Sequence, residues 1–212
     1  MTIFNELESN YPFFWASNPI SGTQLTDTLF KKLSFEEIQE VHKVVRKDDE
    51  ISYERLIQNE KQGGWRYKRE ILTLGAHYCS DWFFEKTGIS SANPPKDVPS
   101  MTRLEIFAGD FYAGDVLLDS LEECGEVIKE GGKYLDFGCS SARVLRNLCA
   151  AYPNSEWYGC DPQKKAIDWA TNTFSKLRLE HTSEDPPLPY EENSFDGGFA
   201  FSVWSHLSRV TA

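Results

Sequence analysis

A chain of 212 residues has room for one medium-sized domain with additional elements, or for two small domains. Apolar residues make up 40% of it and aromatic residues 14%, so a hydrophobic core can form and global disorder is disfavoured. The formal net charge of −11 disfavours a protein whose main task is to grip a nucleic-acid backbone, because binding phosphates requires a positive field.

The cysteines and the N-terminal segment indicate in which cellular compartment the protein is expected. The five cysteines are odd in number and contain no C-x-x-C pair, which is typical of free thiols in a reducing compartment. The first residues lack the basic start and the long apolar run of a signal peptide. No stretch is long and apolar enough to span a bilayer. We therefore expect a soluble cytoplasmic protein with no nucleic-acid or membrane partner.

The first part of the chain has helical patterns. Ser34 followed by Glu37 resembles a capping box, and apolar residues recur after it at helical spacing. A second helical stretch is predicted over 65–86 and ends at Gly88, a good C-cap residue. Aromatic side chains of this region either form its core or help to shape a site: Trp65, Tyr67, Tyr78, Trp82 and Phe83.

A boundary is predicted near residues 90–100. Three prolines and three serines lie within this short run, which is typical of a linker or an ordered loop. We therefore expect a helical region over 1–100, which caps a site or forms the acceptor side of one. Residues 101–212 are expected to form a second domain.

The second region alternates between helices and strands. The expected helices are 116–128, 142–152 and 162–174, and the expected strands lie within 131–138, 156–160, 176–182 and 194–203. Strands separated by single helices imply parallel βαβ units with right-handed crossovers. The fold class is therefore α/β, with a mostly parallel sheet flanked by helices and preceded by the helical N-terminal region.

The first strand of this sheet is followed by a turn of small residues. Gly138, Ser140 and Ala142 allow the backbone to turn sharply and a ligand to approach it. The next helix begins there, with its first N–H groups directed toward such a ligand. The alternative is a tight strand-to-helix turn that binds nothing.

The second strand ends at Asp161, which lies 19 positions beyond Ala142. In a βαβ nucleotide site, an acidic residue at about this spacing binds the ribose hydroxyls. An Asp followed by Pro162 is also typical of an N-cap followed by a first-turn proline. The two roles are compatible, because a carboxylate has two oxygens.

Polar residues also follow the third and fourth strands. Ser183 and Glu184 lie where an adenine edge is bound in such sheets, or they belong to a solvated acidic turn closed by prolines. His206 follows the fourth strand, where a general base would meet an acceptor. A lone histidine there is alternatively structural. We expect no metal ion at this site.

Three segments resemble the class I S-adenosylmethionine-dependent methyltransferases. They are LDFGCSSARVLR (135–146), YGCDPQKKAIDWA (158–170) and PPLPYEENSFDGGFAFSVWSHL (186–207), and they follow one another in the family's order. The resemblance implies a Rossmann-like domain over 101–212 that binds S-adenosylmethionine. The cofactor-binding residues that it implies are Asp136, Phe137, Gly138, Cys139, Ser140, Ala142, Asp161, Pro162, Ser183 and Glu184.

The sequence also departs from the family pattern. Ser140 and Ala142 replace the second and third glycines of D-x-G-x-G-x-G, and Gly197-Gly198 replaces an apolar pair in the fourth strand. The family fold has seven strands, whereas this chain ends just after the fourth. We therefore expect a truncated gene, a fragment, or a sheet whose open edge is completed by a partner, such as a second copy of the chain.

The resemblance implies methyl transfer to an O or N nucleophile of an unidentified acceptor, with His206 as the catalytic base. One alternative is a non-catalytic S-adenosylmethionine-binding or regulatory module. A nicotinamide-dependent dehydrogenase is a further alternative, but it requires G-x-G-x-x-G, and Ser140 and Arg143 occupy the second and third glycine positions.

Overall fold

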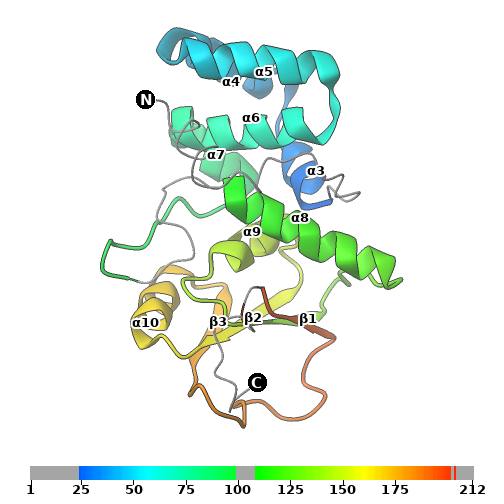
Figure 1. Cartoon of the computed structure of the whole chain (residues 1–212), viewed down its shortest axis with the longest axis vertical. Helices are drawn as coiled ribbons and strands as arrows, with labels where there is room; N and C mark the ends of the chain where they lie inside the picture. The colour runs from blue at the N-terminus through cyan, green and yellow to red at the C-terminus, as the bar shows by residue number, and fades with distance from the viewer. Residues whose placement is uncertain (1–23, 99–107, 202, 204–212) are drawn as a thin grey trace. The chain divides into compact units, whose positions relative to one another are not determined.

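The computed structural model describes residues 24–98, 108–201 and 203. Its contacts divide the chain into two compact units (Figure 1). The described parts of residues 1–91 and 106–124 form a helical unit, and those of residues 92–105 and 125–212 form an α/β unit. Our expected division at residue 100 therefore needs a correction, because residues 108–124 belong to the helical unit.

The helical unit is arranged around one central helix. Helix α6 (Gly64–Tyr78) contacts all the other described helices of the unit. They are α3 (Gln24–Phe30), α4 (Phe35–Asp48), α5 (Glu50–Gln62), α7 (Ser80–Thr87) and α8 (Ala108–Glu123). Helix α6 buries eight successive residues from Arg69 to Ala76, so it is covered on every side there. The aromatic side chains singled out in the sequence differ in burial. Phe83 is fully buried, and four others are partly exposed: Trp65, Tyr67, Tyr78 and Trp82.

Two predicted helix ends are confirmed and one predicted helix is divided. The Ser34 side chain accepts from the Glu37 N–H and the Glu37 carboxylate accepts from the Ser34 N–H, which completes the capping box of α4. Gly88 ends α7 in the left-handed conformation. The expected helix over 65–86 is two helices, because Cys79 leaves the helical conformation between α6 and α7.

A buried ion pair explains why α8 belongs to the helical unit. The Asp115 carboxylate accepts from Arg69 Nη2 at 2.6 Å and from the Thr26 N–H at 2.9 Å, and it also accepts from the Thr26 hydroxyl. These three residues lie on α8, α6 and α3 and are almost completely buried. A buried carboxylate is stable only with such partners, so Asp115 holds α8 to this unit.

The α/β unit is built on a four-stranded parallel sheet within the described residues. The strands are β1 (Lys133–Phe137), β2 (Glu156–Asp161), β3 (Leu177–His181) and β4 (Gly197–Phe199), in the order β3-β2-β1-β4. Helix α9 (Arg143–Ala151) connects β1 to β2, and α10 (Lys164–Thr173) connects β2 to β3. The predicted α/β class, parallel pairing and helical N-terminal region are confirmed.

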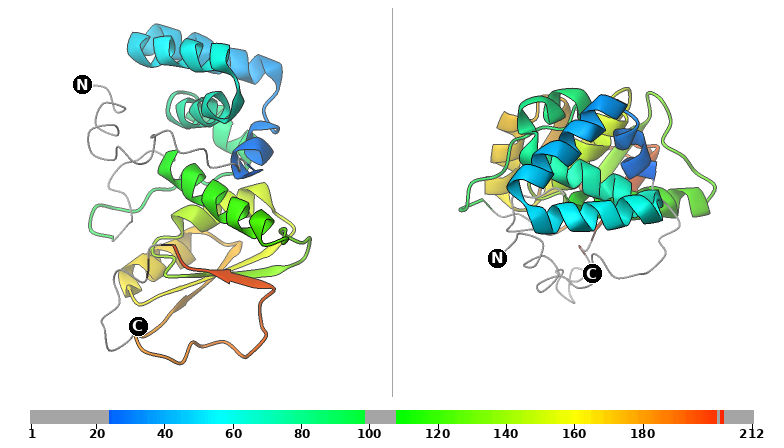
Figure 2. Two further views of the ribbon diagram at one scale, coloured as in Figure 1. Left: turned by 45° about the vertical axis from the view of Figure 1, so that its right-hand side comes forward. Right: turned by 90° about the horizontal axis from the view of Figure 1, so that it is seen from above.

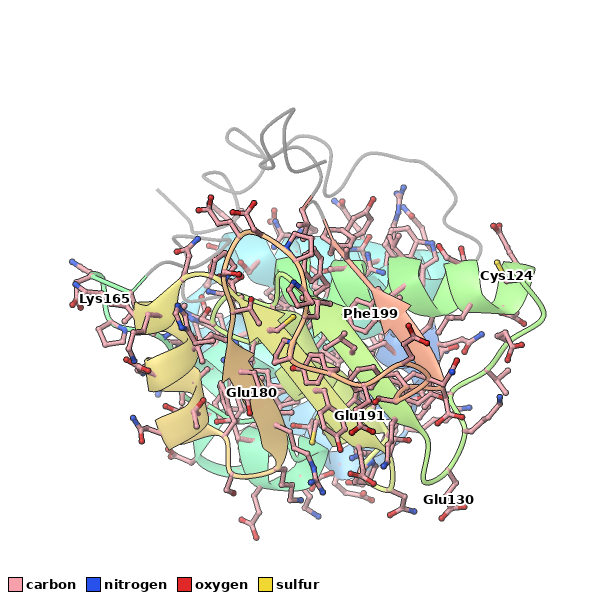
Figure 3. The ribbon with its side chains drawn as sticks, turned by 90° about the horizontal axis from the view of Figure 1, so that it is seen from below. Cys124, Glu130, Lys165, Glu180, Glu191 and Phe199 are labelled. Carbon is pink, nitrogen blue, oxygen red and sulfur yellow. The ribbon has the colours of Figure 1, made fainter. Side chains whose placement is uncertain are left out.

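The two connecting helices lie on one face of the sheet (Figure 2). Gly159 faces α9, because a Cβ atom there would lie 2.8 Å from Leu145. The opposite face carries Tyr158, whose ring packs against Tyr190 and Phe195. These two rings belong to the segment between β3 and β4, which crosses this face and is marked by Glu191 in Figure 3.

Strand β4 is shorter than predicted and lies beside β1. A reciprocal contact fixes its start: the Lys133 N–H donates to Asp196 Oδ2 at 2.9 Å, and the Asp196 N–H donates to the Lys133 carbonyl at 2.8 Å. Two adjacent glycines, Gly197 and Gly198, then form most of the strand, which weakens its preference for the extended state. Among the described residues, no helix has the length and apolar character needed to cross a membrane.

Candidate cofactor-binding site

The turn after β1 has the conformation that a glycine-rich turn normally adopts. Gly138, Ser140 and Ala142 all have positive φ angles, of 83°, 48° and 58°. Backbone hydrogen bonds fix this turn against β2, since the N–H groups of Gly138 and Cys139 donate to the Cys160 carbonyl at 2.8 and 3.2 Å. The two replacements of glycine therefore keep the left-handed geometry, at a cost of about 1–2 kcal/mol each for a residue with a side chain.

Asp161 joins this turn to the end of β2. Its Oδ2 atom accepts from the Ser140 N–H at 2.8 Å, and its Oδ1 atom accepts from the Gln163 N–H at 2.7 Å. Gln163 rather than Asp161 is the N-cap of α10, so the simple capping alternative is wrong. Each carboxylate oxygen has two lone pairs, so Asp161 keeps acceptor capacity for a ligand hydroxyl.

Asp136 is a second buried carboxyl at this sheet edge. Its side chain is 4% exposed, and it forms no hydrogen bond or ion pair in the described part of the chain. Burial, together with the charge of Asp161, raises the pKa of Asp136 to about 8. Asp136 is therefore mainly protonated at neutral pH.

The residues after β3 divide into a buried and an exposed group. The Thr182 N–H donates to the Asp161 carbonyl at 3.2 Å, and its hydroxyl is buried without a hydrogen bond. Ser183 and Glu184 are exposed, and the Ser183 hydroxyl donates to the Asp185 carbonyl at 2.5 Å. Thr182 is therefore better placed than its two successors to meet a ligand beside Asp161.

The remaining predicted residues lie around the same turn, with one exception. Phe137 is the half-buried last residue of β1, Cys139 is buried, and burial raises its pKa well above the ordinary thiol range. Pro162 is exposed, and its carbonyl lies 3.2 Å from His181 Nε2. His206 lies outside the described residues.

Two close approaches at this site had no signal in the sequence. A Cβ atom at Gly138 would lie 2.3 Å from Val203 Cγ2, so the chain after β4 passes directly against the turn. A Cβ atom at Gly159 would lie 2.7 Å from Cys139 Sγ and 2.8 Å from Leu145, so this glycine lets the turn and α9 settle onto β2. Both approaches depend on sheet order, which single glycines do not reveal.

The residues at this edge fit a nucleoside cofactor with a charged tail. The carboxyl ends of neighbouring parallel strands are the usual ligand position in open α/β sheets. Here the Thr182 hydroxyl is buried without a hydrogen bond, and the buried Asp136 carboxyl forms none within the described residues. The two groups lie on either side of Asp161 in the strand order. Orphaned buried polar groups are costly unless a ligand or water binds them. The fold and this site define the class of Rossmann-like cofactor-binding domains.

Comparison with known proteins shows which Rossmann-like domains this chain resembles. Residues 135–212 match the family model of a methyltransferase domain. Eighteen chains of solved structures match, among them coclaurine N-methyltransferase bound to N-methylheliamine and SAH. That match has a TM-score of 0.39 and 11% identity, and it covers 87% of this chain but only 54% of the other, so this chain spans about half its length. A comparison with curated proteins finds no match.

Residues 135–212 are therefore similar to a methyltransferase domain. The matched residues contain most of the candidate site, including the end of β1, the turn after it and Asp161.

Proposed function

We propose that this chain binds S-adenosylmethionine at the Asp136–Asp161 edge and transfers its methyl group to an O or N nucleophile. The observation that carries the proposal is the bond between Ser140 N–H and Asp161 Oδ2, because it fixes the cofactor turn and the ribose-binding carboxylate as one unit. Methyl transfer depends largely on holding donor and acceptor in line, so a rigid cofactor site is what the reaction requires.

Each predicted residue has a specific part in this proposal. The turn from Phe137 to Ala142, with Gly138, Cys139 and Ser140 within it, holds the methionine end of the cofactor. Asp161 accepts from the ribose hydroxyls with the lone pairs that its backbone contacts leave unused. Pro162 shapes the exit from β2.

Thr182, with its unpaired hydroxyl, is proposed as the contact for the adenine edge. Ser183 and Glu184 then serve only as its solvent-exposed border.

The bound cofactor supplies an electrophilic methyl group on a sulfonium, and the protein supplies position and proton acceptance. His206 is proposed as the general base that takes the acceptor's proton, because it follows β4 in the sequence and ligands of parallel sheets bind at the carboxyl ends of the strands. Val203, just before it in the chain, already lies against Gly138 of the turn. A base of this kind contributes about 10²–10⁴-fold to a rate.

Calorimetry with three ligands tests cofactor binding. We expect measurable binding of S-adenosylmethionine and S-adenosylhomocysteine and no binding of NAD. Binding of NAD without a response to either sulfur compound would contradict the proposal and support the dehydrogenase alternative.

A turnover assay tests catalysis separately. The release of S-adenosylhomocysteine is measured with a panel of small amines and phenols, and His206→Asn is compared with the unaltered chain. We expect the variant to lose about 10²–10⁴-fold in rate while cofactor affinity stays unchanged. Binding with no turnover toward any acceptor would favour the non-catalytic module, and equal rates for both proteins would remove His206 from the mechanism.

The compartment and the assembly are part of the same proposal. All five cysteines are free thiols, which agrees with a reducing, cytoplasmic location. Among the described strands β4 pairs on one side only, and a second copy of the chain is proposed to cover its other side, since an unpaired strand edge invites pairing.

A further inference from the structure

The two carboxyl groups of the site are held very differently. Asp161 accepts one backbone N–H on each oxygen, from Ser140 and from Gln163. Asp136 is equally buried but accepts no hydrogen bond from the described residues. Burial without such a partner, and the neighbouring charge of Asp161, both disfavour the carboxylate form of Asp136.

Within the part of the chain that the structure describes, no cation forms an ion pair with Asp136. In the sheet it lies between Gly159 of β2 and Phe199 of β4, neither of which is charged. The titratable groups that face it are the Asp161 carboxylate and the thiols of Cys139 and Cys160.

Helix α9 carries two buried arginines, Arg143 and Arg146, but neither of them forms an ion pair with Asp136. Among the described residues, no ion pair supplies the positive charge that would ionise Asp136, and a bound ligand could supply it.

We propose that binding of S-adenosylmethionine at this site expels the proton of Asp136, so that cofactor affinity rises with pH; this inference rests on the proposed function. The cofactor carries positive charge on its sulfonium and its ammonium group, and either charge favours the carboxylate form of a nearby acid. The proton balance is simple, because the Asp136 O–H bond breaks, its proton goes to the solvent, and the carboxylate pairs with the bound cation. The Asp136 side chain is thus neutral in the free protein and becomes the negatively charged partner of the cofactor's cation when the cofactor binds.

The pH range of the effect follows from the free protein. Burial and the Asp161 charge raise the pKa of Asp136 to about 8, so the acid is protonated before binding at any pH below this value. Release of one proton per bound cofactor makes affinity rise about tenfold per pH unit between pH 6 and pH 8. Above about pH 8 the acid is already ionised, so Asp136 causes no further rise in affinity, and the cofactor's own ammonium group begins to lose its proton.

Titration calorimetry measures both quantities in the intact chain. S-adenosylmethionine and S-adenosylhomocysteine are titrated at pH 6, 7, 8 and 8.5, each in phosphate and in Tris. The two buffers have different ionisation enthalpies, so the difference in heat counts the protons released. We expect close to one proton at pH 6 and 7, progressively fewer from pH 8 upward, and the corresponding rise in affinity.

Three variants assign the proton. Asp136→Asn should bind with no proton release and with an affinity that does not change from pH 6 to pH 8. Asp161→Asn removes the repulsion, so affinity should level off at a lower pH even if overall binding is weaker. His181→Gln controls for the exposed histidine at the end of β3, and it should retain the full pH dependence of the unaltered chain.

The results of these titrations distinguish a failure of the proton-release inference from a failure of the proposed function. Cofactor binding with no proton release and no change of affinity across pH 6–8 would overturn the inference and leave the proposed function standing. A pH dependence that survives Asp136→Asn and disappears in His181→Gln would do the same. No binding of either compound at any pH would overturn the proposed function, and this inference with it.

Discussion

Ala142 is the residue at which this chain departs most clearly from a glycine-rich turn. It has φ 58° and ψ 32°, is the N-cap residue of α9 and is completely buried. An alanine tolerates this left-handed conformation at a cost of about 1–2 kcal/mol, and burial of its methyl group stabilises the fold by about 0.8 kcal/mol. The strain and the packing therefore nearly balance.

This balance makes a matched pair of variants informative. Ala142→Gly should change the free energy of unfolding by less than about 1 kcal/mol, because relief of strain offsets the lost methyl and the greater freedom of the unfolded chain. Ala142→Val should lower it by more than about 2 kcal/mol, since a β-branched residue is strained at this φ and has no space. Urea unfolding measures both changes, and equal stability of the two variants would contradict this account.

Asp161 has a structural and a binding role that one substitution should reveal together. Asp161→Ala leaves the N–H groups of Ser140 and Gln163 without their acceptor, so we expect a loss of about 1–3 kcal/mol in stability. It also removes the ribose acceptor, so cofactor affinity should fall by about 1–3 kcal/mol. Thermal unfolding and calorimetry measure the two losses.

The control for Asp161 is Asp168→Ala, which removes an exposed partner of Lys164 on α10. It should change either quantity by less than about 0.5 kcal/mol. If Asp161→Ala lowered stability but left affinity unchanged, Asp161 would only hold the turn.

At the scale of elements, the contact of α9 and the turn with β2 depends on one glycine. A Cβ atom on Gly159 would lie within 3 Å of Cys139, Leu145 and Leu179, which come from the turn, α9 and β3. Gly159→Ala should therefore lower the free energy of unfolding by about 1–3 kcal/mol, the usual effect of overpacking.

Gly198→Ala is the matched control in the same sheet. There a Cβ atom would meet only the Leu135 carbonyl, at an ordinary 3.8 Å. We expect no loss of stability, because alanine also restricts the unfolded chain. Chemical denaturation compares the two variants, and a larger loss at Gly198 than at Gly159 would show that β4 rather than α9 controls the packing.

The sequence predicts the α/β elements well because each has its own period. The alternation in 176–182 and the helical spacing in 142–152 are local signals, and β3 and α9 lie within those ranges. Helix α5 was missed because few of its residues are buried, with Leu56 as its one fully buried apolar side chain. The break at Cys79 was also missed, since no glycine or proline marks it.

The site was predictable in composition but not in its contacts. Asp136, Gly138 and Asp161 follow from the spacing of the strands. The bond from Ser140 to Asp161 depends on the parallel register of β1 and β2, in which Phe137 lies beside Cys160. The burial that protonates Asp136 and the orphaned Thr182 hydroxyl also arise only from tertiary packing, to which no local pattern corresponds.

For the whole molecule, Asp136 links stability to pH. Its pKa is about 8 in the folded chain and about 4 when unfolded, so between these values the folded state binds one more proton. The contribution of Asp136 to the free energy of unfolding is therefore greatest below about pH 4. It falls by on the order of 1 kcal/mol per pH unit as the pH rises to about 8.

Asp136→Asn should remove this dependence without removing the side-chain shape. We expect the variant to match the unaltered chain near pH 5 and to be clearly more stable at pH 8. Urea unfolding at pH 5, 6, 7 and 8 measures the difference, with the exposed Glu192→Gln as a control that should leave the slope unchanged. Parallel slopes for the chain and for Asp136→Asn would show that other groups set the dependence.

The pairing of β4 with β1 has a consequence for the order in which the α/β unit assembles. Strands β1, β2 and β3 pair with their neighbours along the chain, whereas Lys133 and Asp196 meet across 63 residues. Closing so long a loop is entropically unfavourable and slow, and only three residues of β4 repay it. Strand β4 is therefore the last to dock during folding and the first to detach in native-state fluctuations, and its amide hydrogens exchange with solvent sooner than those of β2.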